Sequence, residues 1–85
     1  MFPNPFQGAL NISFSLAREA SVKIVVFDLA GRVVRRLEEG TRPAGTHLVT
    51  WDGRADAGHP AAAGLYVVRL ETGGMRQSRR VQRIR

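Results

Sequence analysis

Two histidines and two aspartates are the side chains in this sequence that could bind a metal ion. His47 and His59 are the only histidines, and Asp52 and Asp56 lie between them. Their spacing matches no zinc-ligand motif, and residues 52–58 lack the alternating acidic ligands of a calcium loop. The plainer interpretation is turn chemistry, in which both aspartates accept hydrogen bonds from backbone N–H groups. We therefore expect no metal and no other cofactor.

The sequence contains no motif typical of a catalytic nucleophile or of a catalytic acid–base pair. No serine stands in a nucleophile elbow, and no glycine run forms the G-x-G-x-x-G pattern of a phosphate-binding loop. Glu38 and Glu39 are adjacent carboxylates, in a stretch that is typical of a solvated loop. The absence of cysteine excludes disulfides and thiolate chemistry. We expect no enzymatic activity.

Arginine is the residue type that most clearly indicates binding. The 85 residues carry a net charge of +6, and 12 of the 13 basic side chains are arginine. Guanidinium groups make planar, bidentate contacts with carboxylates and phosphates, so this composition favours acidic partners. The candidate partner-binding residues lie in two stretches, residues 75–85, which form the last segment, and residues 32–37. They are Arg76, Arg79, Arg80, Arg83, Arg85, Arg35 and Arg36.

Several partners would suit the arginines of the last segment. In an extended strand, Arg79, Arg83 and Arg85 share one face, while Arg76 and Arg80 share the other. An acidic protein surface or acidic lipid headgroups would complement that charge. Nucleic acid is disfavoured because no aromatic side chain lies among these arginines to stack on bases. Alternatively, the charges only keep a solvated sheet edge from aggregating.

Alternation of apolar and polar residues predicts the strands that would position these groups. Residues 10–16 alternate strictly, and residues 21–28 add a second apolar face, which indicates a central strand. In residues 32–37 the apolar positions, Val34 and Leu37 among them, break the alternation, which predicts a bulge or an edge. Residues 38–45 contain two glycines and a proline, so we expect a loop there.

The same pattern predicts two further strands, at residues 47–51 and 65–72, and a sixth strand is expected at residues 75–84, after a glycine pair. Gly31 and the pair Gly73-Gly74 indicate tight hairpins. Residues 52–64 are expected to form a long loop with a short helical turn near residues 61–63.

One domain is expected to span the whole chain, residues 1–85. Residues 1–8 would be an extended segment leading into the first strand, and residues 75–85 a basic last strand. No apolar run approaches the roughly 20 residues that cross a bilayer, and no signal peptide opens the chain. The strands and turns predict an all-β fold, an immunoglobulin-like antiparallel β-sandwich of about six to seven strands. Its expected core contains Phe14, Ile24, Val26, Val49, Trp51, Tyr66 and Val68.

Motifs at fixed spacing across the chain are carried most visibly by Pro3, Asn4, Pro5, Phe6, Gly31, Trp51, Asp52, Gly53, Gly64 and Tyr66. They resemble a known family, the flagellar hook-capping-type immunoglobulin-like domain. That group overlaps the C-terminal sorting domains of the bacterial type IX secretion system. The resemblance covers nearly the whole chain, although Gln82 and Arg83 stand where the family usually has apolar residues.

This resemblance implies a non-catalytic domain of an exported bacterial protein, placed in the periplasm, at the outer membrane surface or outside the cell. In sorting domains the folded module would be an address that the secretion machinery recognises. We expect such a protein-binding or targeting module. The alternative is a structural accessory subunit that docks on a larger, possibly membrane-bound, complex through its sheet edges and its arginine-rich last strand.

Overall fold

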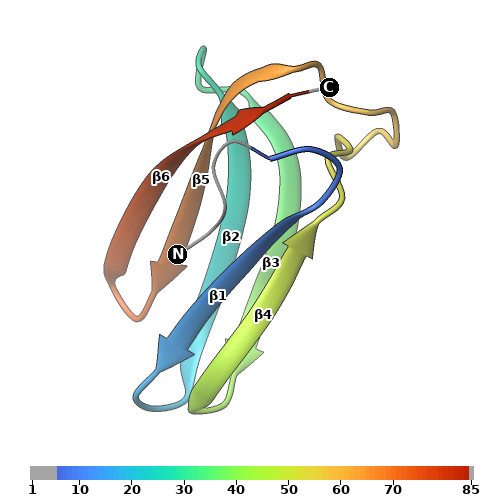
Figure 1. The fold of residues 1–85 in the computed structure, drawn as a ribbon. Helices are drawn as coiled ribbons and strands as arrows, with labels where there is room; N and C mark the ends of the chain where they lie inside the picture. Colours follow the sequence, from blue (N-terminus) through green and yellow to red (C-terminus); the bar gives the residue numbers. More distant parts are fainter. Residues whose placement is uncertain (1–5, 85) are drawn as a thin grey trace.

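Two antiparallel sheets face each other in the computed structural model, which describes residues 6–84 (Figure 1). The strands of this part of the chain are β1 (Leu10–Leu16), β2 (Ala20–Asp28), β3 (Val33–Arg42), β4 (Gly45–Trp51), β5 (Gly64–Thr72) and β6 (Met75–Arg83). One sheet contains β1 and β4, and the other has the order β3-β2-β5-β6. In Figure 1 the small sheet crosses in front of the large one. The predicted all-β, immunoglobulin-like sandwich is confirmed.

Alternating side chains from both sheets fill the space between them. Leu10 lies opposite Trp51 in the small sheet, and Val26 lies opposite Val68 in the large one. The Trp51 indole is fully buried, with its ring centroid 5.5 Å from those of Phe6 and Tyr66. Six of the seven predicted core residues are buried, and the seventh, Val49, is half-buried against the core. The core also takes in Phe6, Leu10, Ile12, Val22, Ala61 and Val81.

The third strand departs from its predicted bounds and confirms its predicted irregularity. It extends to Arg42, because β2 supplies pairing partners along its whole length up to Ala20. The loop expected over residues 38–45 is therefore wrong for most of that range. Two register shifts leave Val34 and Leu37 without a partner on β2, and both pack against the core. The broken alternation reflects two β-bulges in an edge strand.

The segment that leads into β1 closes one end of the sandwich. Phe6 is buried and forms a parallel bridge with Arg83. Its N–H donates to the carbonyl of Gln82, and its carbonyl accepts from the N–H of Ile84, each at 2.9 Å. The polar residues in the last strand therefore take part in the fold through their backbones. The motif residues Pro3, Asn4 and Pro5 lie outside the described residues.

The long loop between β4 and β5 contains no helical turn, so that expectation is wrong. An antiparallel bridge joins Arg54 to Pro60, and the Ala61 N–H donates to the Gly53 carbonyl at 2.8 Å. Ala61 is buried in the core, which holds the returning half of the loop extended against the sandwich. The predicted hairpins at Gly31 and Gly73-Gly74 are present, and all three glycines have positive φ.

Candidate functional site

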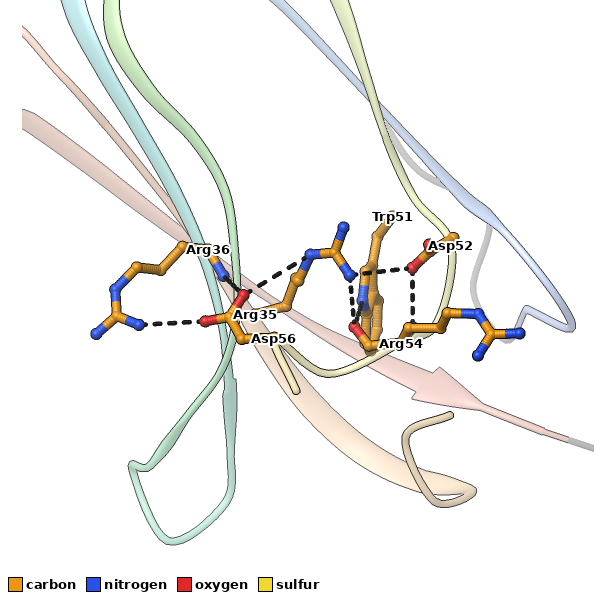
Figure 2. Close-up of polar contacts among 6 residues, drawn as sticks. All are labelled: Arg35, Arg36, Trp51, Asp52, Arg54 and Asp56. Atoms are coloured by element: carbon orange, nitrogen blue, oxygen red, sulfur yellow. Dashed lines mark hydrogen bonds and ion pairs between the residues drawn. The ribbon is translucent and has the colours of Figure 1, made fainter. Parts of the chain in front are cut away.

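Arg35 and Arg36, two of the candidate binding residues, contact aspartates of the β4–β5 loop (Figure 2). The Arg36 guanidinium lies 3.1 Å from one oxygen of Asp56, and the Arg36 backbone N–H donates to the other. The Asp56 N–H in turn donates to the Val34 carbonyl at 2.8 Å. Asp56 therefore fastens the loop to β3 and occupies part of the free edge of that strand.

The Arg35 side chain extends to the end of β4, where it contacts Asp52 and shares an acceptor with Trp51. Its guanidinium lies 3.5 Å from Asp52 and 3.3 Å from the Arg54 carbonyl. That carbonyl also accepts the Trp51 indole N–H at 2.9 Å, and Asp52 accepts the Arg54 N–H. Both aspartates thus accept backbone N–H groups, as the turn interpretation predicts. The guanidinium groups of Arg35 and Arg36 are engaged inside the domain.

The arginines of β6 divide between the two faces of the large sheet. Arg79 lies opposite Val68, a buried core residue, so its side chain starts on the inner face. Arg76 lies opposite Glu71 on the outer face and forms an ion pair with it at 3.6 Å. Arg80 takes the outer face as well. This division agrees with the predicted one for the four described arginines, and Arg85 lies outside the described residues.

Arg79 and Arg83 differ from Arg76, which pairs with Glu71, because no carboxylate of residues 6–84 lies within ion-pair distance of either. Arg79 is exposed. Arg83 is half-buried, and its Nε is buried without a hydrogen-bond partner. A Cβ atom at Gly53 would come within 2.8 Å of that Nε. Arg83 therefore packs over the loop, while Arg79 keeps its charge available to a partner.

Most carboxylates of the chain are already paired. Five of the seven lie within ion-pair distance of an arginine: Asp28, Glu38, Asp52, Asp56 and Glu71. Asp28 accepts the backbone N–H groups of Ala30 and Arg32, and it also binds the Arg32 guanidinium. The backbone hydrogen bond from Arg32 is the main cause that lowers the pKa of Asp28. Six arginines share these five carboxylates, so most of the net charge of +6 lies on the remaining basic residues.

A groove runs between the free edge of β1 and the inner face of β5 and β6, with a volume of about 450 Å³. Ile12 and Phe14 contribute from β1, and Val68 and Leu70 contribute from β5. Arg79 is the one charged residue among those that line it. The groove is therefore an apolar surface that carries a cation on its β6 side.

A family model described as the FlgD Ig-like domain matches residues 4–74. The chain belongs to the FlgD Ig-like domain family. FlgD from P. aeruginosa has a similar structure, with 23% sequence identity and a TM-score of 0.67 over 87% of this chain and 67% of that chain. The alkylpurine DNA glycosylase AlkC from Pseudomonas fluorescens, solved bound to DNA with an abasic site analog, is also similar. It has 17% identity and a TM-score of 0.58, over 98% of this chain and 28% of that chain.

At these identities the likeness to the two solved structures is one of fold. The comparison with curated protein sequences found no match. No helix among residues 6–84 is long and apolar enough to cross a membrane. Within the same residues, no three histidine, aspartate or glutamate side chains gather in a way that could hold a metal ion.

The described motif residues of this FlgD-like domain have structural roles. Trp51 and Tyr66 are core residues, and the Tyr66 hydroxyl donates to the Ala62 carbonyl at 2.5 Å. Burial is the main cause that raises the pKa of Tyr66. Gly31 and Gly53 have φ values of 84° and 79°. The sequence missed the groove, because adjacency of β1 and β6 across the two sheets leaves no local signal in either strand.

Proposed function

We propose that this FlgD-like domain is a non-catalytic structural domain that binds a protein partner through the side of the sandwich where β6 lies. The first support is the family, which is named after FlgD. The sequence resembles the immunoglobulin-like domains of flagellar hook-capping proteins, which are structural. The domain would serve in an exported bacterial assembly, in the cell envelope or outside the cell. Its role there is to hold neighbouring proteins in position.

The observation that carries this proposal is the distribution of charge. Arg35 and Arg36 form ion pairs with Asp52 and Asp56, whereas Arg79 has no carboxylate partner in residues 6–84. Charged groups that complement a partner speed association and select the right surface. An acidic protein surface would therefore meet β6 more readily than β3.

Site-specific photocross-linking in the native cell tests this proposal. A photoreactive residue at Gln77, which is exposed on the same face of β6 as Arg79, should give an adduct with a second protein. Charge reversal by Arg79→Glu should reduce that adduct, and high salt should reduce it further because surface charges are screened. The control position is Leu48, which is 66% exposed on β4. Adducts from Leu48 alone, or adducts that ignore both treatments, would overturn the proposal.

A reporter fusion distinguishes a structural role from the role of a sorting address. A reporter joined to residues 1–85 should stay at its own location if the domain is structural. Appearance of the reporter outside a bacterium that has the type IX secretion system would assign the domain a targeting role instead. The charge-reversed Arg79→Glu fusion would then show whether the same surface is read by the machinery.

A further inference from the structure

The two sheets of the sandwich are unequal, and residues 6–84 leave one strip of the larger sheet's inner face uncovered. Two strands, β1 and β4, lie against four strands in the other sheet. The groove occupies this strip, beside the free edge of β1. Val68, which faces it, is nearly buried, whereas Met75 at its end is 67% exposed. In immunoglobulin-like sandwiches of seven strands the smaller sheet has three, so the strip corresponds to the width of one strand.

The free edge of β1 lacks the features that usually protect an exposed strand. Its sequence, LNISFSL, contains no charged residue and no proline. Edge strands commonly carry charges, bulges or a covering loop that block pairing with another chain. The edge strand β3 has charges, two bulges and the loop held by Asp56. The edge strand β6 carries four arginines, and Phe6 pairs with its last residues.

We propose that an extended, acidic segment of a partner protein adds to β1 as a third strand and fills the groove. Backbone groups of the segment would pair with the free edge of β1, as in other complexes formed by strand addition. Alternate side chains of the segment would enter the groove and contact Phe14 and Leu70. This rests on the proposed function for its choice of a protein partner, but it adds the binding mode and the chemistry of the segment.

Charge decides the kind of segment. Among the residues that line the groove, Arg79 is the only charged one, so the lining attracts a carboxylate and offers no counterpart for a cation. A second copy of the chain is a poor occupant, because it would bring a net charge of +6 against another +6 and its own β1 carries no acid. An acidic segment of another protein satisfies both the apolar lining and Arg79.

The probe is a synthetic heptapeptide with valine at positions 2 and 6, glutamate at position 4 and serine elsewhere, so that one face of the added strand carries the apolar side chains and the carboxylate that Arg79 would meet. Its pattern reads the same in both directions, so it can add to β1 either parallel or antiparallel. The intact domain, labelled with ¹⁵N, is titrated and its amide signals are followed by NMR. The largest changes are expected at residues of β1 and at Gln77 and Arg79 on β6. A peptide with lysine in place of glutamate should bind roughly 10-fold more weakly.

Backbone methylation of the peptide tests strand pairing itself. In a strand, successive N–H groups point to opposite edges, so methylating positions 2, 4 and 6 or methylating the serine positions blocks a different edge. One of these two peptides should lose binding and the other should keep it. Arg79→Gln should weaken binding by roughly 2- to 5-fold, the range of a partly exposed ion pair. The control is Arg54→Glu, in the loop between β4 and β5, because Arg54 does not line the groove. This variant should bind the peptide as tightly as the unchanged domain.

Each other outcome overturns strand addition. Binding that tolerates both methylated peptides and shifts Arg76 and Arg80 would place the acidic partner on the outer face, and the proposed function would stand without this mode. No binding at millimolar peptide would reject the acidic segment, while photocross-linking still reports on the partner. Concentration-dependent pairing of the domain through β1 would identify a second copy as the occupant.

Discussion

Single residues in turns and loops hold the side chains near the end of β6 in place. Gly53 has a φ of 79°, and its missing side chain leaves room for Arg83 on one side and the Gly8 carbonyl on the other. That space lets the Arg83 side chain extend from the end of β6 over the loop. Asp28 acts similarly at the β2–β3 hairpin, where it accepts two backbone N–H groups. Such residues position the surface without touching a partner.

Substitution Gly53→Ala should lower the free energy of unfolding by about 2 kcal/mol or more, because the positive φ is strained and the new methyl would meet the Gly8 carbonyl at 2.9 Å. The matched control is Gly58→Ala, at a φ of 97° with no atom within 4 Å, which should cost about 1 kcal/mol. Urea unfolding followed by Trp51 fluorescence measures both. Equal losses would show that crowding at Gly53 is unimportant.

Individual elements also show what the sequence could and could not predict. Alternation located β1, β2 and β5, since apolar residues recur with a period of two on the face that each strand turns to the core. The glycine pair before it located β6, in which Val81 is the one buried residue. The extension of β3 past Leu37 was missed because Gly40 is typical of turns. Pairing with β2 along the whole strand overrides that local preference, and no local pattern reports it.

The loop that covers β3 gives a prediction at this scale. Asp56→Ala removes the acceptor of the Arg36 N–H and an ion pair whose members are partly exposed. The free energy of unfolding should fall by about 1 kcal/mol, and the amide of Arg36 should exchange with deuterium faster. Glu39→Ala, at an exposed position on the same strand, should change stability by less than about 0.5 kcal/mol. Matching losses in the two variants would mean that Asp56 does not fasten the loop.

At the scale of the whole molecule, the charge was predictable from the sequence and its distribution was not. Counting residues gives +6, but only the structure shows that Arg35, Arg36 and Arg76 face carboxylates while Arg79 does not. Pairing of this kind joins residues that are far apart in the chain. The groove has the same origin, because it depends on how two sheets of different width overlap. The β1 and β6 side of the sandwich is therefore the expected interface.

Hydrogen–deuterium exchange of the domain inside its native assembly, compared with the isolated domain, tests this interface most directly. We predict slower exchange along β1 and β6 in the assembly, with little change along β3 and in residues 52–63. Protection confined to β3 or to that loop, with β1 and β6 exchanging as they do in isolation, would contradict the account.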